Sequence, residues 1–243
     1  MRTISILILG LLAGCASYVT PGGPANLDAI NRADIAEVAS RKPASSFPAR
    51  IAIARVQASN YRSYSAAPMV TGRYSVITTQ ELLTDAALAR VTAWPKVVAA
   101  PSINRLLLPA KVETIEDLRV AGAKLQADVL LVYTLDTSFR VQGRGVGPLS
   151  VVSLGLIPDR DAYISTTASA VFADVRTGYI YGVAEFSAKA SGLTNAWGSR
   201  EVIDRKRIEA EKEAFAGLIN EAGNTWAGIV SQYGVPVQTQ ALR

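Results

Sequence analysis

Residues 127–136 constrain the fold more than any other stretch, because they form an unbroken apolar run with polar residues on both sides: Ala-Asp-Val-Leu-Leu-Val-Tyr-Thr-Leu-Asp. The run has the length of a strand and is short for a helix. An apolar run without alternation is typical of a strand that is covered on both faces. A segment with helical periodicity, residues 114–126, leads directly into it. We therefore predict that 127–136 is a central strand of a mixed sheet, continuing through Phe139 and Val141.

The elements around this strand predict a two-part chain. In the first half, strands alternate with helices, which favours parallel strands joined by right-handed crossovers. We expect strands at 50–57, 73–77 and 97–100, and residues 106–108 either extend or follow the last of these. We expect helices at 79–91 and 114–126. The second half predicts an antiparallel meander and a closing helix, with a turn at 143–148, strands at 149–156, 163–175 and 179–188, a loop at 191–198 and a helix at 199–232. The predicted fold class is α+β: a single domain with a mixed sheet, helices mainly on one face and a long C-terminal helix.

Two helices carry further signals. Thr114 with Asp117 three residues later forms a capping-box pattern at the start of the helix before the central strand. In the C-terminal helix, helical spacing predicts one buried stripe. Its members are Ile208, Phe215, Leu218, Ile219, Ala222, Trp226, Ile229, Val230 and Tyr233. Mixed charges, such as Arg205 with Glu209, are expected on the other face of its first half.

The N-terminus has the pattern of a secretory signal peptide, residues 1–14, in which Arg2 precedes an apolar segment that ends in small residues. Its end, Leu12-Ala13-Gly14-Cys15, resembles the lipobox of bacterial lipoproteins. The resemblance implies cleavage between Gly14 and Cys15, a diacylglycerol on the Cys15 sulfur and an acyl chain such as palmitate on the new amino group. A cytoplasmic apolar N-terminus with a chance cysteine is the alternative.

Three further regions follow the signal peptide. We expect a lipidated tether with a short helix at 15–46, a periplasmic α+β domain at 47–235 and a tail at 236–243. The tether contains the run Pro-Gly-Gly-Pro, which opposes regular structure. Ala16 after the lipidated cysteine, by resemblance to Gram-negative lipoproteins, implies a lipid anchor in the outer membrane with the domain on the periplasmic face.

The composition excludes several kinds of site. The chain has no histidine and one cysteine, which excludes a Ser-His-Asp or Cys-His catalytic arrangement, a Cys/His zinc site and an internal disulfide. We predict no metal, no cofactor and no catalytic residue. The 25 basic and 20 acidic residues give +5, and removal of Arg2 with the leader leaves 24 and 20, or +4. These charges are scattered, so no nucleic-acid partner is expected.

Several motifs in the sequence are candidate sites. Glycines at 143, 145 and 147 suggest a phosphate loop, but Pro148 and a predicted strand follow where a helix is needed, which favours a hairpin turn. Carboxylates could pair as acid and base, although turns usually explain such residues: Asp128, Asp136, Asp159, Asp161, Asp174 and Glu185. Aromatic and arginine side chains in loops favour partner binding: Tyr61, Arg62, Tyr64 and Trp197, with Trp94 a further candidate. The alternative for the tryptophans is that they cap the core.

At the scale of the domain, two short motifs carry a resemblance. Gln126-Ala127-Asp128 enters the apolar strand, and Asp174-Val175-Arg176-Thr177-Gly178 forms a hairpin before the closing helix. This order over residues 50–233 resembles the domain shared by the curli-secretion lipoprotein CsgG, the N-terminal domain of TolB and LpoB. The resemblance implies no catalytic residue. Local turn bonds of Asp and Thr can also explain the hairpin motif.

The leading functional hypothesis is a non-enzymatic adaptor or assembly subunit of envelope machinery. Its predicted partners are the membrane, through lipidated Cys15, and an unidentified envelope protein; an oligomer is possible. One alternative is a CsgG-like secretion pore subunit, for which 139–157 is the source of a membrane hairpin but lacks an aromatic girdle. A second alternative is a carboxylate-based envelope hydrolase.

Overall fold

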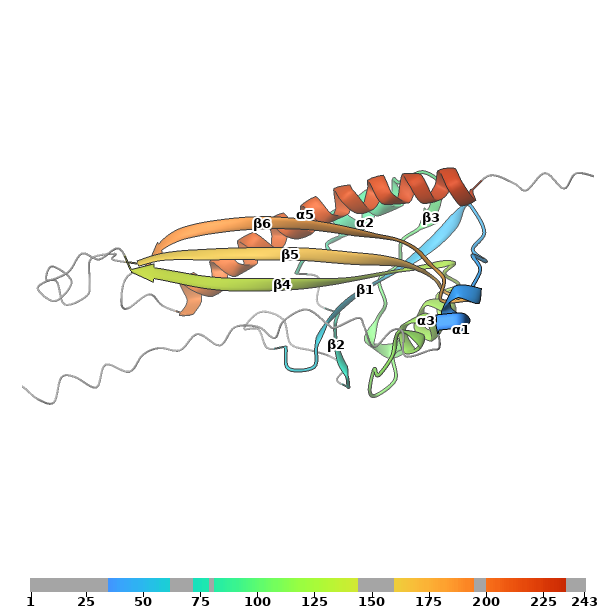
Figure 1. The fold of residues 1–243 in the computed structure, drawn as a ribbon, viewed down its shortest axis with the longest axis horizontal. Coiled ribbons are helices and arrows are strands. Elements are labelled where there is room, and N and C mark those ends of the chain that lie inside the picture. Colours follow the sequence, from blue (N-terminus) through green and yellow to red (C-terminus); the bar gives the residue numbers. More distant parts are fainter. Residues whose placement is uncertain (1–34, 62–71, 79–80, 144–159, 195–199, 235–243) are drawn as a thin grey trace, which may run out of the picture.

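The computed structural model describes residues 35–61, 72–78, 81–143, 160–194 and 200–234 (Figure 1). The strands are β1 (Ala49–Ala58), β2 (Tyr74–Ile77), β3 (Val97–Ala99), β4 (Val129–Gly143), β5 (Arg160–Asp174) and β6 (Ile180–Thr194). The helices are α1 (Ile35–Ser40), α2 (Asp85–Thr92), α3 (Ile115–Lys124) and α5 (Arg200–Tyr233), with a 3-10 turn η2 (Arg105–Leu107). The strands form one mixed sheet in the order β2-β1-β4-β5-β6, and β3 pairs with the start of β1.

The predicted central strand is confirmed as β4. It runs parallel to β1, with Ile51 opposite Val129, and antiparallel to β5 along its whole length. Leu130 is fully buried and Leu131 is only 2% exposed, so both faces of the strand are covered at this point. The α+β prediction, with a mixed sheet and a long C-terminal helix, is therefore confirmed.

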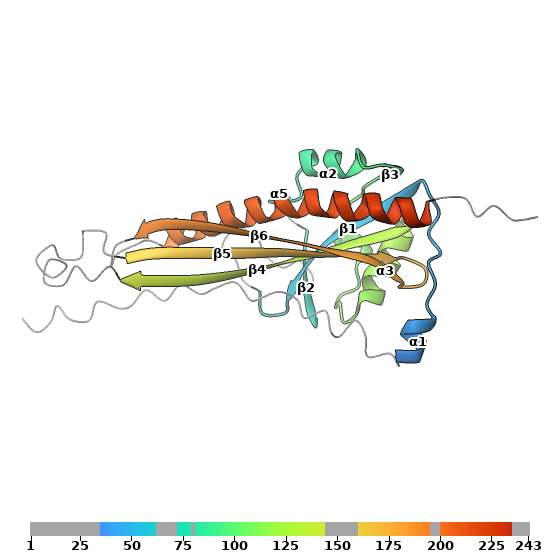
Figure 2. The same cartoon turned by 45° about the horizontal axis from the view of Figure 1, so that its top comes forward.

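The helices divide the core into two layers because successive strand residues point to opposite faces. Val129, Leu131 and Tyr133 pack on the side of α2 and α5, whereas Leu130 and Val132 pack on the side of α3. Figure 2 shows α2 and α5 together on one side of the strands. Most of the helical mass thus covers one face, as predicted, and α3 covers the other face of β1 and β4.

Two parts of the molecule can be distinguished along β4 (Figure 1). We call the part built on β1, β2, β3, α2 and α3, with the first half of β4, the body. We call the part from Asp136 onward in β4, with its paired residues up to Thr167 in β5 and from Ser187 in β6, the arm. The first half of α5 runs along the arm. Each of β4, β5 and β6 has 15 residues, which makes them about 50 Å long.

The predicted strand at 149–156 lies outside the described residues. The position antiparallel to β4 that we predicted for it is occupied by β5, with register from Val129–Asp174 to Gly143–Arg160. β6 also continues to Thr194, so the loop predicted at 191–198 was placed too early. The arm is thus built from β4, β5 and β6, which pair with one another along their whole length.

Side-chain caps explain where the shorter elements begin. The N–H of Ala87 donates to Thr84 Oγ1 at 3.3 Å, so α2 starts after Thr84 and not at residue 79. The predicted capping box of α3 is confirmed, since Asp117 accepts from the N–H of Thr114 at 3.1 Å. The prediction of a strand at 106–108 is wrong, because the Asn104 side chain accepts from the Leu106 N–H and starts a 3-10 turn.

The β5–β6 hairpin holds the N-terminal segment against the body. Asp174 accepts from the N–H groups of Arg176 and Thr177 at 2.8 and 3.0 Å, and Gly178 takes a φ of 71°. Its other oxygen accepts from the Ala44 N–H at 2.7 Å and from Ser45 Oγ at 2.9 Å. We call residues 41–48 the strap. The strap therefore joins the domain at the end opposite the tip of the arm (Figure 1).

These contacts also set the protonation state of the hairpin carboxylate. Burial raises the pKa of Asp174, but hydrogen bonds from Thr177, Ala44, Tyr181 and Ser45 outweigh burial and bring the pKa below its ordinary value. Burial raises the pKa of Tyr181, which donates to Asp174 at 2.8 Å, to about 12. Asp174 is thus a charged structural group.

None of the helices in the described residues combines the length and the apolar character that a membrane span requires.

Candidate functional site

The first half of α5 turns charged side chains toward the sheet. Asp204, Arg207 and Glu211 are buried, with Arg207 fully inaccessible. The prediction that the charges of this half lie on the outer face is therefore wrong for these three residues. Their spacing was the missed signal, because Glu211, Phe215 and Leu218 follow one another at helical steps of four and three and so share one stripe.

These residues form a buried ionic cluster with groups from β1 and the segment before α2. Arg207 donates to Glu211 at 2.6 Å and to Asp204 at 3.0 Å. The other carboxylate oxygen of Glu211 accepts from Arg55 Nη2 at 3.4 Å. Arg55 Nη1 also lies 3.8 Å from Glu81. Two arginines thus face three carboxylates where the body meets the arm.

Neutral side chains complete the cluster. Tyr61 is fully buried and so has no surface that a partner could contact. Its ring centroid lies 5.5 Å from the Arg55 guanidinium, and its hydroxyl lies 3.2 Å from Arg55 Nη2. The prediction of Tyr61 as a partner-binding residue is therefore wrong. On the arm side, Thr137 donates to Glu211 at 3.3 Å and lies 3.0 Å from the Thr166 hydroxyl. The cluster ties β1, β4 and β5 to α5.

The cluster changes the acid–base properties of its members. Burial opposes the charge of Arg207, but the attraction of Glu211 and the bonds to Glu211 and Asp204 outweigh burial and raise the Arg207 pKa. Burial also raises the pKa of Tyr133, which packs 4.9 Å from Phe215 between the ring centroids. Buried pairs of this kind contribute little net stability, but losing one partner is costly because a charge stays buried without compensation. The cluster is therefore a structural device that fixes the position of α5.

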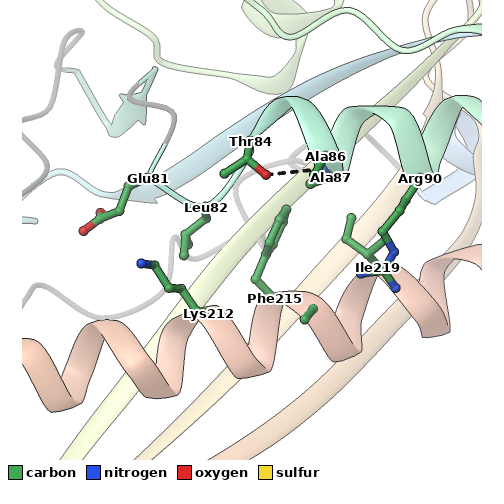
Figure 3. A pocket seen from close by; sticks show the side chains of 10 residues that line it. Glu81, Leu82, Thr84, Ala86, Ala87, Arg90, Lys212, Phe215 and Ile219 are labelled. Carbon is green, nitrogen blue, oxygen red and sulfur yellow. Dashed lines mark hydrogen bonds between the residues drawn. The ribbon is translucent and has the colours of Figure 1, made fainter.

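A groove of about 360 Å³ lies on the outer side of this region, between α2 and α5 (Figure 3). Leu82, Phe215 and Ile219 line it with apolar groups. Figure 3 places Lys212 toward one end and Arg90 toward the other. The remaining lining residues are Glu81, Thr84, Ala86, Ala87 and Ala216. The groove has no local signature in the sequence, because its walls come from helices that are more than 100 residues apart.

The charged groups of the groove differ in how they are held. Glu81 belongs to both the groove and the ionic cluster, where it faces Arg55. Arg90 donates to the Asn220 side chain across the groove. Lys212 is exposed, and no ion pair within the described residues engages it. The groove therefore presents two cations to an incoming ligand, whereas Glu81 is mostly buried and faces Arg55 without a hydrogen bond from the described residues to its Oε2 atom.

The predicted acid–base residues are spread over the sheet. Asp128 accepts from the Arg50 N–H at 2.9 Å, which makes it a structural group like Asp174. Glu185 is exposed and accepts from Ser169 at 2.8 Å, and Asp136 is exposed in the middle of β4. The Asp161 side chain and the whole of Asp159 lie outside the described part. No cluster of three metal-ligating side chains occurs in the described residues.

The remaining predicted site residues are distributed as follows. Trp94 packs on Phe172, with ring centroids 6.2 Å apart, as expected for a tryptophan that caps the core. Gly14, Cys15, Arg62, Tyr64 and Trp197 lie outside the described residues.

Comparisons with known proteins do not assign this chain to a family. No family model and no curated protein matches this sequence. Among solved structures, the chain is similar to a DUF330-family protein from Xanthomonas campestris, with 10% identity, a TM-score of 0.35 and coverage of 79% of this chain and 91% of the other. It is also similar to a hypothetical protein from Chlamydia trachomatis, with 11% identity, a TM-score of 0.35 and coverage of 76% and 99%. At these scores neither likeness supports a conclusion about fold or function.

Proposed function

We propose that the protein is a non-enzymatic adaptor, or assembly subunit, of envelope machinery, held by lipid on Cys15 at the periplasmic face of the outer membrane. The observation that carries the proposal is the polarity of the molecule. The strap enters at one end, and the arm, in which each strand extends about 25 Å beyond Asp136 and its paired residues, projects from the other end. An anchored protein of this shape can hold a partner away from a membrane surface.

The contacts of the strap support this proposal. Asp174, Tyr181 and the Asp128 carbonyl all bind Ser45, so the strap is fixed to the body and not merely continuous with it. Arg176 adds a bond to the Ala44 carbonyl. A pull on the tether is thus transmitted to the hairpin end of the body, while the arm stays free for a partner.

The anchor is tested by Cys15→Ala. We expect the variant to move from the membrane fraction to the soluble periplasmic fraction, because the lipid is the only attachment that we infer. The measurement is fractionation of cells followed by immunoblotting, with the wild type as the reference. A variant that still sediments with the outer membrane after a high-salt wash would contradict the anchor.

The adaptor role is tested by photo-crosslinking from the full chain in its own cells. Benzoylphenylalanine at the exposed arm position Ser138 should give a discrete crosslinked species, whereas the same group at the exposed α1 position Glu37 should not. The species should disappear in the Cys15→Ala background, where the protein is no longer held at the membrane. Crosslinks from Glu37 alone, or a species that forms equally without the anchor, would rule out the proposed role of the arm.

A further inference from the structure

The groove between α2 and α5 has the features of a small docking site for a protein segment. Its apolar lining comes from Leu82, Phe215 and Ile219, and its volume is about 360 Å³. That volume lies at the lower end of the range of ligand sites. It suits one large apolar side chain, with the adjoining backbone, better than an extended ligand.

The rim of the groove allows a partner backbone to come close. Ala86 on α2 and Ala216 on α5 both line the groove, and both are exposed. Because alanine side chains are small, neither helix blocks access to the groove at these two positions. A partner segment can therefore lie across the two helices while one of its side chains enters between them.

The charges of the groove select the chemistry of that segment. Lys212 and Arg90 lie toward opposite ends of the groove in Figure 3, with Phe215 between them. Glu81 faces Arg55 at 3.8 Å and is only 13% exposed, so it does little to neutralise the two cations at the surface. Complementary charge in a partner favours the correct segment and disfavours basic ones.

We infer that this groove docks a partner segment in which an apolar side chain is flanked by two carboxylates. The apolar side chain packs against Leu82, Phe215 and Ile219, and the carboxylates meet Lys212 and Arg90. The inference rests on the proposed adaptor function; beside the arm, it gives that function a second contact surface on the body and the chemistry of the partner segment.

The test uses three synthetic tripeptides with blocked ends: Glu-Leu-Glu, Gln-Leu-Gln and Lys-Leu-Lys. Each is titrated into the ¹⁵N-labelled protein, and amide shifts are followed by NMR. We expect Glu-Leu-Glu to shift residues around Leu82 and Phe215 and to bind about fivefold more tightly than Gln-Leu-Gln, the size of effect expected for exposed charge pairs. Lys-Leu-Lys should bind most weakly.

Charge reversal separates the groove from general electrostatics. In Lys212→Glu, the preference for Glu-Leu-Glu over Lys-Leu-Lys should be lost or inverted. The matched control is Lys189→Glu, which makes the same charge change at an exposed position on β6 and should keep the wild-type preference. Ala216→Trp, which fills the groove, should weaken all three peptides while the protein keeps its melting temperature.

Each result decides something. Shifts located away from α2 and α5, or equal binding of the acidic and basic peptides, would overturn the inference. If peptide binding fails but the Ser138 crosslink forms, the adaptor proposal stands and only the groove is lost as its docking site. If peptides bind the groove but Ser138 gives no crosslink, the site remains a peptide-binding groove and the adaptor role of the arm fails.

Discussion

The body and the arm use the same strands but bury them differently. In the body, helices cover both faces of β4, and most of the buried side chains of this part of the strand are aliphatic, such as Leu130 and Leu131. In the arm, α5 covers one face, and the opposite face exposes polar groups. There the Thr167 and Ser187 hydroxyls pair at 2.7 Å.

The interior of the arm is also chemically different. Between the sheet and α5 it buries Thr166, Arg207 and Glu211 beside Ile164, whereas the buried charge of the body is Arg55, which belongs to the same cluster. Apolar packing is non-directional and tolerates small adjustments, but a buried ionic network requires every member to keep its partner. The body therefore supplies stability, whereas the arm depends on specific polar contacts for its geometry.

The largest effect is expected at the centre of the body. Leu131→Asp should abolish folding, because an unpaired buried carboxylate costs several kcal/mol, on the order of the whole stability. Circular dichroism and thermal unfolding measure the loss. The matched control is Ser138→Asp, which places the same carboxylate at an exposed position in the arm part of the same strand and should fold normally. A native-like Leu131→Asp protein would contradict the central-strand assignment.

The next effect concerns the ionic cluster. Arg207→Met should destabilise the protein by roughly 3–5 kcal/mol, because Glu211 and Asp204 stay buried with less compensation. Urea unfolding measures this change, and hydrogen exchange should locate the increased opening in the arm before the body. The double variant Arg207→Met/Glu211→Leu should recover part of the loss. If the double variant is less stable than the single one, the ionic cluster itself contributes net stability. That result would contradict the view that the body, and not the cluster, stabilises the protein.

A smaller effect is expected at the β5–β6 hairpin, where Asp174 binds the strap. Asp174→Asn should cost roughly 1.5–3 kcal/mol through loss of hydrogen bonds to a charged group. Because folding lowers the Asp174 pKa from 3.8, its stabilisation is present above that value and is lost as pH falls through the lower folded pKa. The melting-temperature gap between wild type and Asp174→Asn should therefore narrow under strongly acidic conditions. A gap that is constant with pH would mean that the charge of Asp174 does not hold the strap.

The smallest effect compares the two faces of the arm. Thr137→Val removes the hydroxyl that binds Glu211 and should cost about 1 kcal/mol. Thr167→Val is the matched control on the opposite face, where water can replace the lost bond, and should change stability much less. Chemical denaturation of the two variants measures the difference. Equal losses would show that the two faces of the arm are energetically alike.

Local patterns in the sequence determined much of the fold. The apolar run at 127–136 predicts the central strand, the Asp-x-x-Thr-Gly pattern predicts the β5–β6 hairpin, and the apolar stripe predicts α5, because each feature depends on neighbours within a few residues. The capping box at Thr114 belongs to the same class. These elements are specified by periodicity and by local hydrogen bonds, and neither depends on residues far away in the sequence.

The environment of the charged and aromatic side chains depends on tertiary contacts. Arg207 and Glu211 point inward because β1 brings Arg55, 156 residues from Glu211, into contact with α5. Tyr61 is buried because that same arginine offers its ring and hydroxyl a partner. The groove exists because α2 packs beside α5. A buried charge needs a partner; Arg55 and Glu211 supply one for each other from segments far apart in the chain, and local periodicity does not contain that information.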